Sequence, residues 1–117
     1  MVGMYKTVLP KDVAEEMEKL LSWYAAQPKN METLAKFHAR YESIHPFQDG
    51  NGRTGRMILF RESLKYEEVD PFIILDDDRT VYIEALKEFR EKGTVARLTE
   101  LLQKEAEIYY KQCEYFM

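Results

Sequence analysis

The chain has 117 residues, close to the commonest size of a single domain, and 45% of them are hydrophobic and 32% charged, as in ordinary globular proteins. No apolar run reaches about 18 residues and the N-terminus lacks the apolar core of a signal peptide, so neither a membrane span nor secretion is expected. Seventeen basic and 21 acidic residues give a net charge of −4, which disfavours nonspecific binding to nucleic acid.

Cysteine and histidine are scarce in this sequence. Cys113 is the single cysteine, and the two histidines are His38 and His45. An internal disulfide, a cysteine zinc site and an all-histidine metal site are therefore not expected. This cysteine usage favours a reducing cytoplasm, and we expect a bacterial one.

Two helices are predicted in the first half of the chain. Asp12 and Glu15 have the spacing of a capping box, and apolar residues then recur at helical intervals. After a loop over 27–30, Asn30 can cap a second helix, which Pro46 ends because the residue before a proline disfavours α geometry. The residues expected to face the core are Val13, Met17, Leu20, Leu21 and Tyr24, then Leu34, Phe37, His38, Tyr41 and Ile44. We expect His38 to be a buried, hydrogen-bonding residue with a structural role.

Three more helices are predicted in the second half. One starts near Asn51 and runs to about Lys65, and an apolar turn region over 69–75 follows it. Asp78 can cap the next helix and Gly93 can close it, and the last helix runs from about Thr94 into the tail. The residues expected to face the core are Met57, Ile58, Phe60, Leu64, Val81, Leu86, Phe89, Val95, Leu98, Leu101 and Leu102. The predicted fold is all-α, with at most one short hairpin at the N-terminus.

The segment from His45 to Arg56, HPFQDGNGRTGR, joins two of these helices and is unusually rich in chemistry. The turn over 49–52 opens onto a helix, so its backbone N–H groups and the helix N-terminus favour a bound anion. Arg53 and Arg56 lie on one helical face, and the planar guanidinium suits phosphate. The segment lacks the Lys-Ser/Thr ending of a Walker loop, so it predicts a polyphosphate site of another kind.

Two further side chains complete this segment. Asp49 lies within the turn, and a carboxylate beside phosphates is the usual ligand of Mg²⁺. His45 stands at the entrance to the turn, and a histidine is the most common general base near pH 7. A base, a metal ligand, an anion-binding turn and two arginines together indicate transfer of a phosphoryl or nucleotidyl group onto a hydroxyl.

The same segment resembles the signature of the Fic family, H-P-F-x-[D/E]-G-N-G-R-x-x-R, with each fixed position matched. The resemblance extends over most of the chain. The start over 3–8 is similar to the family's flap segment, 17–23 to its M-x-x-L-L-x-W helix, and 82–86 with Gly93 to its late Y-x-x-A-L helix and turn. His38 and His45 have the family's spacing. We therefore expect residues 1–117 to form one Fic core domain, a compact helical fold with a short β-hairpin flap, as part of a longer protein.

The resemblance implies transfer of AMP from ATP to a Ser, Thr or Tyr hydroxyl of a target protein. It implies that His45 is the catalytic base, that Asp49 holds Mg²⁺, and that Phe47 is a buried anchor. It implies that ATP phosphates are bound by Gly50, Asn51, Gly52, Arg53 and Arg56, with Arg56 at the γ-phosphate. Tyr82 would line the nucleobase pocket, and the flap residues that dock the target would be Tyr5, Lys6, Thr7 and Val8. The family often self-associates, which leaves a homo-oligomer open.

The sequence departs from the family at two places. Lys6 stands where an Arg is usual, and few residues separate Val8 from Val13, so the return strand of the hairpin is shortened. Fragments over 63–67 and 80–84 match the first five positions of the family's inhibitory helix, but neither continues with Gly or Asn. No inhibitor is therefore expected within the chain. Two alternatives stay open: the same fold with another donor (another nucleotide, phosphocholine or a transferred γ-phosphate), or a module that binds nucleotide or a partner without turnover.

Overall fold

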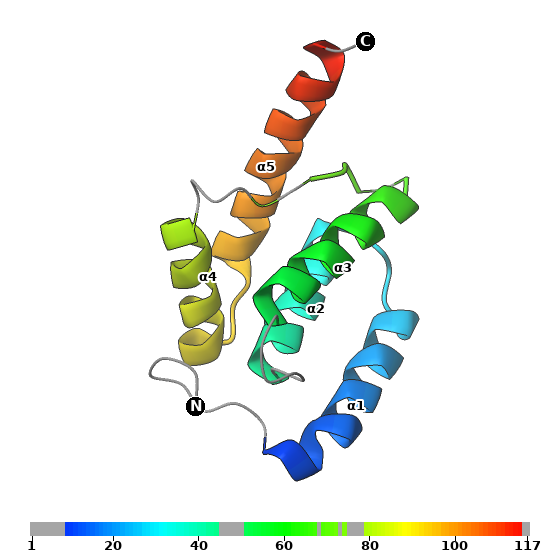
Figure 1. Ribbon diagram of the computed structural model, residues 1–117, viewed down its shortest axis with the longest axis vertical. Helices are drawn as coiled ribbons and strands as arrows, with labels where there is room; N and C mark the ends of the chain where they lie inside the picture. Colours follow the sequence, from blue (N-terminus) through cyan, green and yellow to red (C-terminus); the bar gives the residue numbers. More distant parts are fainter. Residues whose placement is uncertain (1–8, 45–50, 68, 73, 75–78, 116–117) are drawn as a thin grey trace.

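The computed structural model describes residues 9–44, 51–67, 69–72, 74 and 79–115 (Figure 1). A short 3-10 helix, η1 (Pro10–Asp12), leads into α1 (Val13–Ala26), and α2 (Met31–Ile44) and α3 (Asn51–Lys65) follow. The chain continues with α4 (Arg79–Lys92) and ends with the longest helix, α5 (Ala96–Tyr115). The all-α prediction is confirmed, since these residues contain no strand. The expected hairpin flap lies in residues 1–8, outside the described part of the chain.

Helix α2 is the centre of the bundle. It contacts α1, α3, α4 and α5, and α3 lies across it in Figure 1. The apolar face predicted for this helix is confirmed, because Leu34, Phe37, Tyr41 and Ile44 are all buried, and His38 is buried among them. Burying one such leucine or phenylalanine stabilises the fold by about 1.5–3 kcal/mol, so α2 fixes the positions of its neighbours. None of the helices in the described residues is long and apolar enough to cross a membrane.

The helix ends follow the predicted caps in part. The Oδ1 atom of Asn30 accepts the Thr33 N–H at 2.9 Å, and Gly93 closes α4 with φ 74° while its N–H donates to the Phe89 carbonyl at 2.8 Å. Both caps are confirmed. Asp12 does occupy the N-cap of α1, but its side chain makes no capping hydrogen bond, so the capping box is wrong. Asp78 lies outside the described residues.

The inward faces of α3 and α4 differ from the prediction. Met57, Leu64 and Val81 are 66%, 54% and 46% exposed, and Leu21 on α1 is 52% exposed. The buried stripe of α3 is Gly55, Leu59 and Ser63, at intervals of four residues. Gly55 and Ser63 let α3 approach α2 closely on either side of Leu59, and Met57 and Leu64 lie on the outward side of the helix. The sequence interpretation weighted hydrophobicity and missed this stripe.

Ser63 shows what the small residues of α3 do. Its Oγ donates to the Phe60 carbonyl at 2.7 Å and accepts the Phe72 N–H at 3.4 Å. Phe72 is 1% exposed, so the segment after α3 is tied back to the core by a backbone hydrogen bond and a buried ring. The apolar turn region predicted over 69–75 is thereby anchored at Phe72.

Gly55→Ala is expected to destabilise the fold by about 1–3 kcal/mol, the usual cost of overpacking. A Cβ at position 55 would overlap Oε1 of Glu42 and lie 3.0 Å from a ring carbon of Tyr41, both in α2. Helix propensity alone predicts the opposite sign, because alanine is better than glycine in a helix by about 1 kcal/mol. Urea unfolding of Gly55→Ala and of the neighbouring Thr54→Ala separates the two effects, and a gain in stability for Gly55→Ala would contradict the packing at this point.

Candidate active site

The predicted anion-binding turn leads directly into α3, whose first residue is Asn51. Asn51 and Gly52 therefore form the first turn of a helix of 15 residues, as the sequence predicts. The free N–H groups and the positive end of the helix dipole meet there, which favours a bound anion. His45, Phe47, Asp49 and Gly50 lie outside the described residues, as does the flap, Tyr5 to Val8.

The two signature arginines follow on α3. Arg53 is exposed and Arg56 is half-buried, three residues further along the same helix. Their spacing places both on one side of the helix, next to its N-terminus. The guanidinium carbon of Arg56 lies 5.9 Å from the centre of the Tyr82 ring, which comes from α4. The structure thus brings Tyr82 to one of the arginines that the sequence predicts to bind phosphate.

A buried polar cluster, formed by His38, Glu42 and Tyr82, lies beneath this arginine. These side chains are 1%, 7% and 6% exposed. The Nε2 atom of His38 is 2.5 Å from the Tyr82 hydroxyl oxygen and 3.8 Å from Oε1 of Glu42. Buried polar groups are costly unless they are partnered, so this cluster is tightly constrained in its protonation states.

His38 is neutral in this cluster. Burial lowers the pKa of its imidazole to about 3, and the charge of Arg56 acts in the same direction, while a hydrogen bond with the backbone of Gly55 acts against them. A neutral imidazole has one donor and one acceptor nitrogen, and a carbonyl can only accept. We therefore assign the ring proton to the nitrogen that faces the Gly55 carbonyl, so that Nε2 accepts the Tyr82 O–H.

Tyr82 keeps its proton at all ordinary pH values. Burial raises the pKa of its hydroxyl, the charge of Glu42 raises it further, and Arg56 opposes the rise through its charge and a side-chain hydrogen bond. The hydroxyl donates to His38, and its lone pairs face the guanidinium. The prediction that Tyr82 lines a nucleobase pocket stays a prediction.

Glu42 is the acidic member of the cluster. Burial raises the pKa of its carboxyl group to about 7, and the charges of Arg56 and Arg90 act against this rise. Its Oε1 atom accepts no hydrogen bond within the described part of the chain and occupies the space that Gly55 leaves open. Because His38 is neutral, their contact is not an ion pair. The sequence interpretation missed Glu42, although a carboxylate one turn after a histidine on an apolar helix face is a usable signal.

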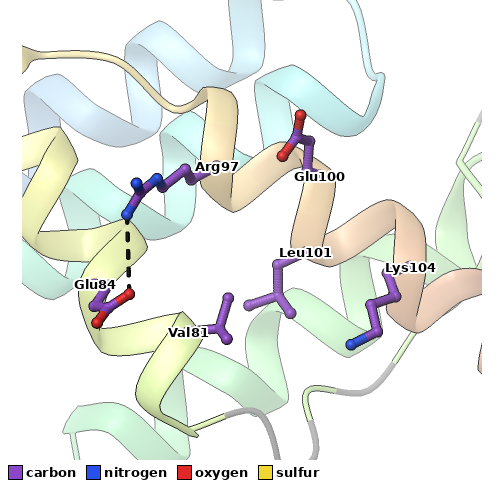
Figure 2. A pocket seen from close by; sticks show the side chains of 6 residues that line it. All are labelled: Val81, Glu84, Arg97, Glu100, Leu101 and Lys104. Carbon is purple, nitrogen blue, oxygen red and sulfur yellow. Dashed lines mark ion pairs between the residues drawn. The ribbon is translucent and has the colours of Figure 1, made fainter.

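A groove between α4 and α5 lies apart from this cluster. Figure 2 shows the side chains around it, and Arg97 Nη1 reaches Oε2 of Glu84 at 3.9 Å across one end. Its volume is about 330 Å³, and its lining residues are Val81, Glu84, Arg97, Glu100, Leu101 and Lys104. Val81 and Tyr82 are neighbours on α4 and face different sides of it. None of the residues predicted for the active site lines this groove.

Comparison with known proteins supports the family resemblance. The family model described as Fic/DOC family matches residues 2–61, which include the whole segment from His45 to Arg56. The chain is 36% identical to protein adenylyltransferase fic-1 of Caenorhabditis briggsae over 64 residues, 50% of this chain and 12% of the relative. It is 32% identical to protein adenylyltransferase Fic of Nematostella vectensis over 83 residues, 68% of this chain and 19% of the relative.

A third relative is the probable protein adenylyltransferase aq_aa38 of Aquifex aeolicus, which is 33% identical over 89 residues, 74% of this chain and 27% of the relative. The chain therefore spans between 12% and 27% of the length of these relatives. The match to the family model covers more than half of the chain and contains the signature. The chain belongs to the Fic/DOC family.

The pH dependence of stability tests the protonation of the cluster. Above pH 7, wild type carries a buried ionised Glu42. As pH falls from 7 to 4.5, the native state takes up a proton at Glu42 before the unfolded state does, which adds stability. As pH falls from 6.5 to about 3, His38 takes up a proton in the unfolded state but not in the native state, which lowers the stability of the native state. The two slopes oppose each other between pH 6.5 and 4.5.

The substitution Glu42→Gln removes the pH dependence of stability that comes from Glu42 and leaves the one that comes from His38. Relative to wild type, the variant is expected to be more stable at pH 8, and this advantage is expected to shrink as pH falls towards 4.5, by up to about 1.4 kcal/mol per pH unit. Denaturant unfolding from pH 4.5 to 8 measures this, and Glu107→Gln, at an exposed position on α5, is the matched control. Parallel profiles for Glu42→Gln and wild type would contradict the raised pKa of Glu42.

Proposed function

We propose that the chain transfers AMP from ATP to a Ser, Thr or Tyr hydroxyl of a target protein and releases pyrophosphate. The observation that carries the proposal is a complete Fic signature that runs directly into the N-terminus of α3, in a chain that belongs to the Fic/DOC family. Relatives named protein adenylyltransferase support the same chemistry. The proposed unit is one Fic core domain over residues 1–117.

The proposed reaction is a single displacement at the α-phosphorus. His45 accepts the proton of the target hydroxyl, the hydroxyl oxygen bonds to the α-phosphorus, and the bond from that phosphorus to the bridging oxygen of the β-phosphate breaks. The backbone N–H groups of residues 50–52 and the α3 N-terminus hold the phosphates and receive their charge. Arg53 binds the phosphates, Arg56 binds the γ-phosphate, and Phe47 anchors the loop.

Asp49 is the proposed ligand for Mg²⁺. An ion at this position would take one carboxylate from the protein and share its remaining positions with phosphate oxygens and water, which is how Mg²⁺ is usually held beside nucleotides. When bound, the ion would neutralise part of the phosphate charge.

The proposed target contact is the segment Tyr5–Val8, acting as an edge strand onto which the target backbone adds. The proposed partners of the chain are thus ATP and a protein that presents a hydroxyl side chain.

Labelled ATP tests the function directly. With ATP labelled at the α-phosphate, Mg²⁺ and cell lysate, wild type is expected to label protein, and His45→Ala to reduce the rate by about 100-fold or more, because a general base contributes about 10²–10⁴-fold. Gln48→Ala, at the variable position of the signature, is the matched control and keeps the activity. The readout is label on protein bands after denaturing electrophoresis.

Each other result points to a different function. Label from the γ-phosphate in place of the α-phosphate would replace AMP transfer by phosphoryl transfer. Label that persists in His45→Ala would remove the assigned base. Calorimetric binding of ATP without any label would favour another donor or a nucleotide-binding module.

A further inference from the structure

The guanidinium of Arg56 is supported by a neutral side chain. Its carbon lies 5.9 Å from the centre of the Tyr82 ring, and it contacts the hydroxyl side of the same residue through a hydrogen bond. Among the described residues, no carboxylate is within ion-pair distance of Arg56. Glu42 interacts with Arg56 electrostatically, without an ion-pair contact. Within the described part of the chain, the arginine is thus restrained without a partner of opposite charge.

Tyr82 is itself fixed from the other side. Its hydroxyl lies 2.5 Å from Nε2 of His38 and donates to it in the tautomer assigned above, and the His38 ring also interacts with the backbone of Gly55. These contacts thus run from Gly55 on α3 through His38 on α2 to Tyr82 on α4, whose ring lies beside the next residue of α3, Arg56. Such a set of contacts restrains the guanidinium relative to the helix that carries it.

Restraint of this kind matters for an arginine that must meet an anion. A free arginine side chain samples many rotamers, and ordering it on binding costs affinity. A carboxylate partner would also restrain it, but that partner would compete with a phosphate for the same charge. An aromatic ring and a hydroxyl restrain the guanidinium by cation–π attraction and one hydrogen bond without neutralising it.

We propose that Tyr82, held by His38, is a positioning residue that aims Arg56 at the terminal phosphate of bound ATP. The inference rests on the proposed function for the role of Arg56. A tyrosine that only fills the core would stabilise the fold without distinguishing between nucleotides. A residue that positions an arginine for the γ-phosphate raises the affinity for ATP, which has this phosphate, but leaves the affinity for ADP unchanged, because ADP lacks it.

The test compares ATP and ADP by calorimetry with Mg²⁺, in a His45→Ala background that prevents turnover. Tyr82→Phe removes the hydroxyl and keeps the ring, so a folded protein is expected. Tyr41→Phe is the matched control, because Tyr41 is a buried tyrosine of α2 whose hydroxyl has no hydrogen-bond partner among the described residues. Arg56→Gln shows how much of the preference for ATP over ADP depends on the arginine.

The expected result is a loss of roughly 10-fold in ATP affinity for Tyr82→Phe, with ADP affinity unchanged within about twofold. Arg56→Gln abolishes the preference for ATP, Tyr41→Phe retains it, and Tyr82→Phe adds nothing when combined with Arg56→Gln. If Arg56→Gln abolishes the preference but Tyr82→Phe leaves it intact, or weakens ADP as much as ATP, this inference falls and the proposed function stands.

An NMR measurement without nucleotide tests whether Tyr82 restrains Arg56, even if the wild type does not distinguish ATP from ADP. In wild type, the Nε–H proton of Arg56 is expected to exchange slowly with water in ¹⁵N NMR, and Tyr82→Phe but not Tyr41→Phe is expected to accelerate this exchange. If wild type shows no preference for ATP, the role of Arg56 in the proposed function is overturned. Equal exchange in both tyrosine variants would then overturn the positioning of Arg56 as well.

Discussion

The close approach of α2 and α3 at Gly55 is the constraint on which the rest of the molecule depends. Because this position has no side chain, the carboxylate of Glu42 and the ring of Tyr41 fit against the backbone of α3. The same approach brings the Gly55 carbonyl within reach of the His38 ring. The core packing and the polar contacts beneath Arg56 therefore have one origin. A protein that loosened this contact would lose both together.

The cost of this arrangement is a set of polar groups held away from water. His38, Glu42 and Tyr82 could each be replaced by apolar residues with no loss of hydrophobic burial, and such replacements of buried polar networks are often neutral or stabilising. Their presence beneath the first turns of α3 is better explained by what they do for the helix above them. They connect three helices at the point where the signature ends, at Gly55 and Arg56.

Much of this fold could be predicted from the sequence. The approximate positions of the five α-helices follow from the periodicity of apolar residues, and two of their ends follow from Asn30 and Gly93 as caps. The signature could be recognised because its residue types are chemically unusual in one short segment. The inward face of α3 could not be predicted, since close helix packing selects Gly55 and Ser63 over Met57 and Leu64. Glu42 was missed because a carboxylate within an apolar stripe contradicts the pattern by which the stripe is recognised.

The bond between His38 and Tyr82 joins residues that are 44 positions apart, and it crosses the limit of the family match at residue 61. The matched region holds the complete signature, whereas the side chain that supports its second arginine comes from α4. A shortened chain that ends at residue 61 would contain every residue of the signature but would lack the Tyr82 ring next to Arg56. The proposed positioning of Arg56 therefore depends on a residue outside the region by which the family is recognised.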